Sequence, residues 1–167
     1  MEKSKFINDL YFKALELEEK GNYVEAFDLF MKGASLGDDG AQNAVGLAYD
    51  SGSGVEKNKE KALYWFKKAW RSDRKSYKCL NIALTYAEIG RRRQALYWWK
   101  KAISLGDGSA ALALAKFLMS SDQRRSLNRA IDLLQMAVKS EDPWRISFEE
   151  REEARELLHS LKSTDPS

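Results

Sequence analysis

The sequence contains very little of the residue chemistry that most metal and catalytic sites need. Its 167 residues include one cysteine, Cys79, and one histidine, His159, far apart in the chain. This pair cannot supply a His/Cys metal cluster, which needs several such ligands. A single cysteine cannot form an intramolecular disulfide, and it suits a reducing compartment. We expect Cys79 to be a small buried apolar residue and His159 to lie at the surface.

Long apolar runs and early prolines are also missing from the sequence. No stretch reaches the roughly 18 apolar residues of a membrane span, and the N-terminus lacks the apolar run of a signal peptide. We therefore expect a cytoplasmic protein without a membrane segment. Pro143 and Pro166 are the two prolines, so helices before residue 143 can run without interruption.

The formal net charge of +3 is distributed unevenly along the chain. Residues 1–50 carry 5 Lys/Arg and 10 Asp/Glu, residues 51–139 carry 19 and 7, and residues 140–167 carry 4 and 8. A basic middle segment can attract a partner with an acidic surface. The alternative is that these basic residues coat the solvated faces of helices. The pI of about 8.9 is lower than is typical of a nucleic-acid-binding domain.

Four segments of the chain align without gaps and share one pattern of small and large residues. They begin at Ala26, Ala62, Ala95 and Ala130, with spacings of 36, 33 and 35 residues. Another small residue follows seven positions on, and large apolar residues occupy the fourth and fifth positions: Leu29/Phe30, Trp65/Phe66, Trp98/Trp99 and Leu133/Leu134. These spacings place the residues on one helical face. Small residues let a neighbouring helix approach closely, while the large side chains fill the space beside it.

A further helix, marked by its own small residue, precedes each of these segments. The small residues are Ala14, Gly46, Ala83 and Ala115, and the expected helices cover about 4–20, 23–36, 39–51, 58–72, 76–89, 92–105, 108–120 and 126–140. Ser147 and Glu150 form a capping box that predicts a ninth helix. The sequence thus predicts an all-α fold, a right-handed α-solenoid of four helix–turn–helix repeats with a C-terminal capping helix. The repeats cover about 4–37, 38–73, 75–107 and 108–142 of a domain at 1–143, and the cap with a short tail covers 144–167.

Two stretches resemble repeats of the Sel-one-like (Sel1-like) family. They are Ala41-Gln-Asn-Ala-Val-Gly-Leu-Ala-Tyr-Asp-Ser-Gly-Ser-Gly-Val55 with Lys61-Ala-Leu-Tyr-Trp-Phe-Lys-Lys-Ala69, and Gln94-Ala-Leu-Tyr-Trp-Trp-Lys-Lys-Ala-Ile-Ser-Leu-Gly-Asp107. The resemblance covers about residues 6–140. Repeats one and three have a shorter step between their small residues, similar to the related tetratricopeptide family, and repeat four departs from the pattern at Leu118 and Met119. The resemblance implies a binding scaffold without catalysis or cofactors, but it does not identify a partner.

The tetratricopeptide-like arrangement would place the first helix of each repeat on a concave surface. Counting from the small residue of each first helix selects the candidate partner-binding residues: Tyr11, Leu15, Asn43, Leu47, Asp50, Tyr77, Asn81, Leu84, Glu88 and Lys116. Amides such as Asn43 and Asn81 can pair with the backbone of an extended peptide. The alternative for any single one of these residues is a place in the core between helices.

Two other surfaces are candidates for binding a partner. Tyr64 and Tyr97 occupy equivalent, normally solvated positions on the convex side. A basic edge is formed by Arg91, Arg92, Arg93, Arg124 and Arg125. Nucleic-acid binding would need this edge and exposed stacking aromatics, whereas an acidic protein surface needs only the edge.

The leading hypothesis is therefore a non-enzymatic protein-interaction scaffold, without cofactor or metal, that binds a protein or peptide. A bacterial immunity protein that occludes a toxin is its sharper variant, and a nucleic-acid binder is the alternative. The sequence does not specify the oligomeric state.

Overall fold

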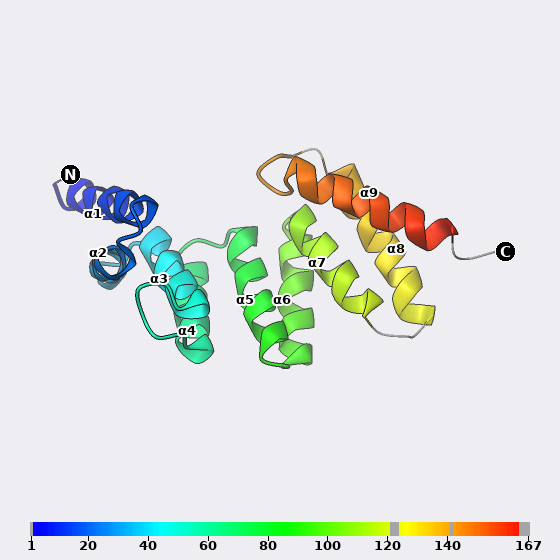
Figure 1. The fold of residues 1–167 in the computed structure, drawn as a ribbon, viewed down its shortest axis with the longest axis horizontal. Helices are drawn as coiled ribbons and strands as arrows, with labels where there is room; N and C mark the ends of the chain where they lie inside the picture. The colour runs from blue at the N-terminus through cyan, green and yellow to red at the C-terminus, as the bar shows by residue number, and fades with distance from the viewer. Residues whose placement is uncertain (1, 121–123, 141, 164–167) are drawn as a thin grey trace. The chain divides into compact units, whose positions relative to one another are not determined.

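The computed structural model describes residues 2–120, 124–140 and 142–163, and all regular structure within them is α-helical (Figure 1). The helices are α1 Glu2–Glu19, α2 Tyr23–Ser35, α3 Asp39–Ser51, α4 Lys59–Ser72, α5 Ser76–Glu88, α6 Arg92–Ser104, α7 Gly108–Met119, α8 Arg124–Lys139 and α9 Phe148–Ser163. Each of the eight ranges expected from the repeat pattern agrees with these bounds within two residues. The prediction of an all-α repeat fold is confirmed.

A Leu-Gly-Asp sequence connects α2 to α3 and recurs between α6 and α7. Gly37 and Gly106 adopt φ values of 99° and 84°, which glycine reaches without a steric penalty. The carboxylates of Asp38 and Asp107 then accept the backbone N–H three residues later, at 2.6 and 2.8 Å. These aspartates are the N-caps of α3 and α7. The same local chemistry therefore ends one helix and begins the next.

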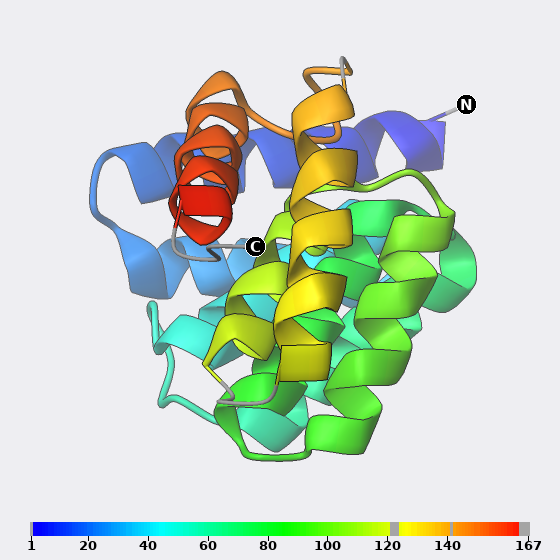
Figure 2. The ribbon, with the colours of Figure 1, turned by 90° about the vertical axis from the view of Figure 1, so that its right-hand side faces the viewer.

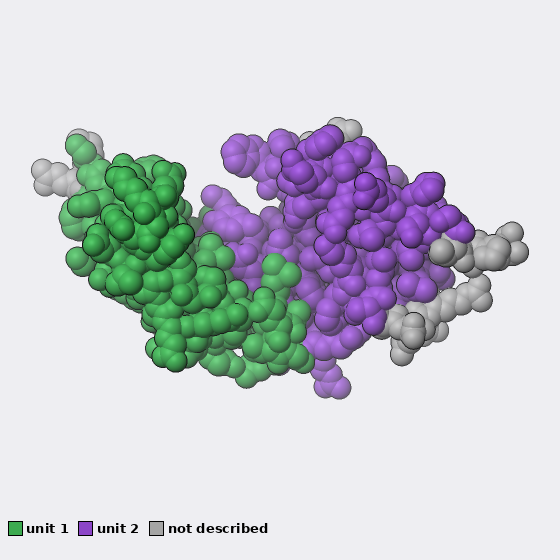
Figure 3. Space-filling view, in the orientation of Figure 1, with its two compact units in different colours: residues 1–74, 84–91 green, residues 75–83, 92–167 purple. Residues whose placement is uncertain are grey.

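The chain forms two compact units (Figure 3). Unit 1 contains residues 1–74 and 84–91, and unit 2 contains residues 75–83 and 92–167. The division falls within α5, so this helix contributes to both units. The repeat boundaries expected from the sequence stay a prediction.

The core of unit 1 follows the small–large pattern of the repeats. Ala14 and Ala26 are fully buried, and the rings of Phe30 and Phe66 are 1% exposed. A Cβ placed on Gly46 would lie 2.5 Å from the ring of Phe66, closer than any real contact. Glycine at this position therefore lets α3 and α4 pack against each other without a gap.

The core of unit 2 is built around Trp99 of α6. This side chain is 2% exposed, and its ring centroid lies 4.8 Å from that of Phe117 in α7. Leu114 and Leu134 are buried in the same unit. The fifth residue of each repeated segment is thus a core residue, as the pattern predicts for Trp99 and Leu134.

Helix α9 packs along α8 and is the last helix of unit 2 (Figures 1 and 2). The Ser147 N–H donates to Glu150 Oε2 at 2.9 Å, and the Glu150 N–H donates to Ser147 Oγ at 3.1 Å. This reciprocal pair is the expected capping box. Ala154 is fully buried, so α9 covers a neighbouring helix with one face, as a capping helix does.

Candidate protein-binding surfaces

The residue that follows the small residue of each first helix is at least partly exposed. Leu47 of α3 is 47% exposed and Leu84 of α5 is 41% exposed, and both belong to unit 1. Leu15 of α1 is half-buried, and Lys116 of α7 is exposed. A single exposed leucine is ordinary. Two leucines at the same position of successive first helices form a candidate contact row.

A cluster of ionic groups joins three helices of unit 1 beside these leucines. The Lys59 Nζ of α4 lies 3.0 Å from Asp50 Oδ1 of α3 and also contacts the Glu88 carboxylate at the end of α5. Thr85 Oγ1 donates to Asp50 Oδ1 at 2.8 Å. Asp50 and Glu88, two of the candidate partner-binding residues, are therefore held in place by Lys59.

The charge of this cluster follows from the pKa of Lys59. Burial lowers this pKa, but hydrogen bonds to Glu88 and Asp50 and the attraction of their charges outweigh that effect, so the pKa is raised above its usual value. Lys59 is consequently a cation at neutral pH, and the two carboxylates leave the cluster one net negative charge. Sequence reasoning missed Lys59, because its two partners come from other helices and no local spacing connects them.

The aromatic and amide candidates lie in different surroundings. Tyr11 is half-buried, with its ring centroid 5.6 Å from that of Phe30, so it lies at the edge of the unit 1 core. Asn43 in unit 1 and Asn81 in unit 2 are both half-buried, and each already has an interaction within the protein. Tyr77, also in unit 2, is 40% exposed. Each of these four side chains keeps some accessible surface.

In unit 2, Lys116 is connected to the C-terminal helix. Its Nζ lies 2.6 Å from Glu153 Oε1 of α9, and both side chains are about half exposed. An exposed pair of this kind contributes little stability. It does place an acidic side chain of α9 next to the last candidate residue, a neighbour that the repeat pattern alone does not reveal.

The two candidate tyrosines of the second helices are exposed, as their position in the repeat predicts. Tyr64 and Tyr97 are 59% and 58% exposed. Each ring packs edge-on against the next tryptophan, with centroids 5.3 Å apart at Trp65 and 5.4 Å apart at Trp98. Each ring thus partly covers an indole while much of the tyrosine side chain stays exposed to solvent, as is usual for an amphipathic aromatic side chain.

The arginines of the basic edge are partly engaged within the protein. Arg91 Nη2 lies 2.6 Å from Glu60 Oε1 in unit 1. In unit 2, the Arg92 guanidinium lies 4.6 Å from the ring centre of Phe117. Arg124 and Arg125 begin α8, but their side chains lie outside the described residues. Two of the five arginines thus have partners that reduce their availability to phosphates.

Within residues 2–120, 124–140 and 142–163, no group of three or more His, Cys, Asp or Glu side chains is arranged to hold a metal ion. Cys79 is fully buried and His159 is exposed. Both residues are therefore where the sequence predicts them. No helix in this described part is long and apolar enough to cross a membrane.

The Sel1 repeat family model matches residues 9–38, 40–73, 91–107 and 108–142 of this chain. None of the curated proteins compared with the chain matches it. Among solved structures, a Sel1 repeat protein from Oxalobacter formigenes is 22% identical with a TM-score of 0.68, over 93% of this chain and 60% of that one.

Two other solved structures are similar to the chain. A protective antigen of uropathogenic Escherichia coli strains with an SLR fold is 17% identical with a TM-score of 0.67, over 96% of this chain and 38% of that one. A MamA protein is 16% identical with a TM-score of 0.65, over 97% and 87%. The chain therefore spans less than two thirds of the Oxalobacter and Escherichia proteins. At these identities the similarity concerns the fold alone.

Proposed function

Because this chain belongs to the Sel1 repeat family, whose members are generally protein-interaction scaffolds, we propose that it is a non-catalytic scaffold for a protein or peptide partner. The binding surface we assign is the first-helix face of unit 1, formed by Asn43, Leu47, Asp50, Leu84 and Glu88. The observation that carries this proposal is the pair of exposed leucines, Leu47 and Leu84, beside the Asp50–Lys59–Glu88 cluster.

The chemistry of the first-helix face defines the partner that it fits. Leu47 and Leu84 offer apolar contact area, and Asn43 can pair with a peptide backbone. The net negative charge of the cluster favours a basic side chain on the partner. We therefore expect an extended segment that combines apolar side chains with a Lys or Arg. This differs from the acidic partner that the basic middle of the sequence suggests.

The test uses a partner captured from the native host by cross-linking to the full chain and then purified. Replacing both leucines, Leu47→Ala with Leu84→Ala, should weaken this complex at least tenfold, equivalent to about 1.4 kcal/mol. The loss should appear mainly as faster dissociation. Tyr64→Ala with Tyr97→Ala is the control, because it removes two exposed aromatic side chains from second helices, outside the assigned surface. A complex weakened by the tyrosine changes and unaffected by the leucine changes would refute the assigned surface.

Nucleic-acid binding through the basic edge is the second candidate. The positive charge of residues 51–139 favours it, whereas the engagement of Arg91 and Arg92 opposes it. We expect no appreciable affinity of the wild type for random-sequence RNA or DNA at physiological salt. Submicromolar, salt-sensitive binding that disappears in the Arg91→Ala, Arg92→Ala, Arg93→Ala variant would establish this alternative instead.

The cellular compartment and the identity of the partner are predictions from the sequence. We expect a cytoplasmic partner, and a toxin occluded by this chain would be one example. Co-expression with the product of a neighbouring toxin gene tests that immunity role. Protection of the cells by the wild type, and its loss in the double leucine variant, would support both the role and the surface.

A further inference from the structure

The turn between α6 and α7 in unit 2 holds an arginine from a later part of the chain. Arg145 Nη1 donates to the Leu105 carbonyl at 2.8 Å, and the Arg145 carbonyl accepts from the Gly108 N–H at 2.8 Å. A Cβ built on Gly106 would overlap the Arg145 guanidinium, so this side chain lies directly over the turn. The preceding residue, Trp144, is 95% exposed and stays outside the contact. The carbonyl end of α6 therefore binds a cation, as the negative end of a helix dipole favours.

The turn between α2 and α3 in unit 1 has the same backbone hydrogen bonds. The Gly37 N–H donates to the carbonyl three residues earlier at 3.2 Å, and the Asp38 N–H donates to the carbonyl five residues earlier at 3.1 Å. The corresponding bonds of the α6–α7 turn are 2.8 and 3.2 Å long. Turns with the same hydrogen bonds follow the same backbone path. The Leu36 carbonyl of unit 1 is therefore the counterpart of the Leu105 carbonyl that binds the arginine in unit 2.

The arginine position over the unit 1 turn is open. Apart from its neighbours in the chain, no atom of the described residues lies within 4 Å of a Cβ built on Gly37. Within this described part, no group donates a hydrogen bond to the Leu36 carbonyl. Asp38 is half-buried, whereas its counterpart Asp107 is 4% exposed. The two turns thus share their backbone, but only the one in unit 2 is covered by Arg145.

A cavity of about 460 Å³ lies at the open turn. Its walls come from Ser4, Ile7, Asn8, Leu36, Gly37, Asp38 and Asp39. None of these seven residues is a cation. Asp38 Oδ1 accepts the Ala41 N–H, and the second oxygen of this carboxylate can accept from a guanidinium. Ile7 and Leu36 provide apolar surface for the methylene groups of an arginine side chain.

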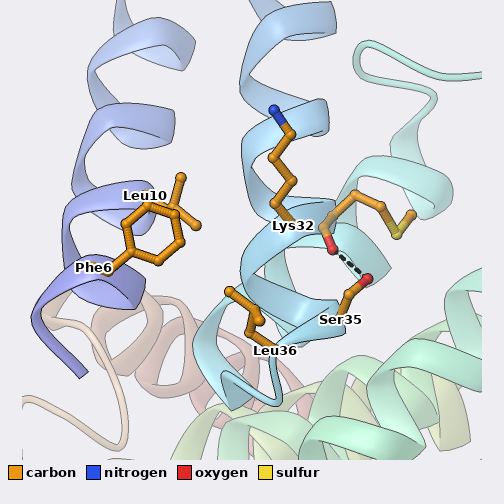
Figure 4. Close-up of a pocket in the computed structure, with 6 residues that line it drawn as sticks. Phe6, Leu10, Lys32, Ser35 and Leu36 are labelled. Atoms are coloured by element: carbon orange, nitrogen blue, oxygen red, sulfur yellow. Dashed lines mark hydrogen bonds between the residues drawn. The ribbon is translucent and has the colours of Figure 1, made fainter. Parts of the chain in front are cut away.

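An apolar cavity between α1 and α2 adjoins this one (Figure 4). Leu36 lines both cavities, and Phe6 and Leu10 line the apolar one, whose volume is about 330 Å³. Phe6 and Leu36 are 56% and 41% exposed. A ligand whose guanidinium lies over the turn therefore has apolar surface beside it for an adjacent side chain.

We propose that the α2–α3 turn of unit 1 binds an arginine side chain of a protein partner, with the guanidinium over Gly37 and a hydrogen bond to the Leu36 carbonyl. Arginine is the ligand because the matching turn of unit 2 binds one, and because the cavity combines a carbonyl acceptor with a carboxylate and no cation. Asp39 precedes Asn43 by one turn of α3, so the site extends the first-helix face. Its use by the partner rests on the proposed scaffold function.

A peptide that copies the bound segment of unit 2 tests the site without the partner. The probe is acetyl-Asp-Pro-Trp-Arg-Ile-amide, the sequence of residues 142–146, titrated into the ¹⁵N-labelled full chain while amide chemical shifts are recorded. The Gly37 and Gly40 signals should shift saturably, with a Kd on the order of 1 mM. A peptide with citrulline in place of arginine keeps the shape and loses the charge, so it should bind at least tenfold more weakly. Failure of the peptide to bind would leave the scaffold proposal standing, because the leucine variants test that proposal separately.

Substitutions in the cavity give a second measurement. Asp38→Asn keeps a capping oxygen but removes the negative charge, so the Kd should rise at least threefold. Asn8→Lys adds a cation to the cavity wall from an exposed position on α1 and should have a similar effect; it serves if Asp38→Asn is misfolded. Asp28→Asn, an equal change of charge on the exposed side of α2 and outside both cavities, should bind like the wild type.

Three results would each overturn the arginine site. The first is the absence of saturable shifts at Gly37 and Gly40 up to about 10 mM peptide, as would also occur if an arginine of the chain itself filled the site. The second is equal binding of the arginine and citrulline peptides. The third is undiminished binding by both Asp38→Asn and Asn8→Lys.

Discussion

The ring of Phe66 occupies the space that a side chain on Gly46 would need. A Cβ on Gly46 would lie 2.5 Å from two ring atoms of Phe66, and that ring is 1% exposed. The ring is confined by its surroundings and has little freedom to move away. This pair therefore sets how closely α3 and α4 approach each other in unit 1.

Gly46→Ala should consequently destabilise the protein, although alanine favours a helix. The overpacking strain, near the upper end of about 1–3 kcal/mol, exceeds the gain in helix propensity of about 1 kcal/mol. We expect a lower free energy of unfolding in urea denaturation. In a Phe66→Leu background the clash is relieved, so the same change should be neutral or stabilising. A stabilising Gly46→Ala in the wild-type background would show that the two helices can separate at little cost.

Trp99 and Trp98 should respond differently to truncation. Trp99→Ala should lower the free energy of unfolding by about 3–5 kcal/mol, the usual range for a buried aromatic residue. Trp98→Ala should lower it clearly less, because Trp98 is half-buried. The Trp99 Nε1 has no hydrogen-bond partner among the described residues. Trp99→Phe removes that unpaired donor and should therefore cost far less than Trp99→Ala. Chemical denaturation of the three variants checks this order.

We expect the free energy of unfolding to depend on pH because of Asp107. Burial raises the pKa of its carboxyl above the usual value, and this effect outweighs the lowering by hydrogen bonds from the Ala110 N–H and Ser76. The folded state then holds the proton more tightly than the unfolded chain does. The free energy of unfolding therefore falls as the pH rises from the unfolded-state pKa through the folded-state pKa.

Two substitutions separate the charge of Asp107 from its role as the N-cap of α7. Asp107→Asn keeps the capping oxygen, so it should be at least as stable as the wild type at pH 7 and should lack this part of the pH dependence. Asp107→Ala loses the cap and should be about 1 kcal/mol less stable than Asp107→Asn. Urea denaturation at pH 4 and pH 7 measures both effects. An identical pH dependence in the wild type and Asp107→Asn would contradict the raised pKa.

The helices could be predicted from the sequence because their signals are local. The spacing of small and large residues fixes the buried face of each second helix, and Gly37 with Asp38 ends one helix and starts the next. The capping box of α9 likewise involves residues three apart, Ser147 and Glu150. Such signals lie within one or two helical turns, where residue spacing determines which groups can meet.

The details of the candidate surfaces could not be predicted, because they depend on residues from separate helices. Lys59 meets Asp50 and Glu88 only after three helices pack together. Lys116 meets Glu153 across 37 positions of the chain. The exposure of Trp144 depends on where its loop docks on α7. No periodicity in the sequence signals these long-range pairs.

Removing residues 148–167 should expose the face of α8 that α9 covers, while keeping the loop that carries Trp144. The exposed face is apolar, and a terminal repeat without its cap tends to aggregate. We expect helical circular dichroism with a lower unfolding midpoint, increased binding of a hydrophobic dye and loss of a monodisperse elution profile.

Glu150→Ala is the matched control, because it breaks the capping box and the 2.8 Å bond from Ser109 Oγ but leaves α9 in place. The Glu150→Ala substitution should lower the free energy of unfolding by about 1 kcal/mol and should not increase the binding of the dye. A truncated chain as stable and as monodisperse as the Glu150→Ala variant would show that unit 2 does not depend on α9 as its cap.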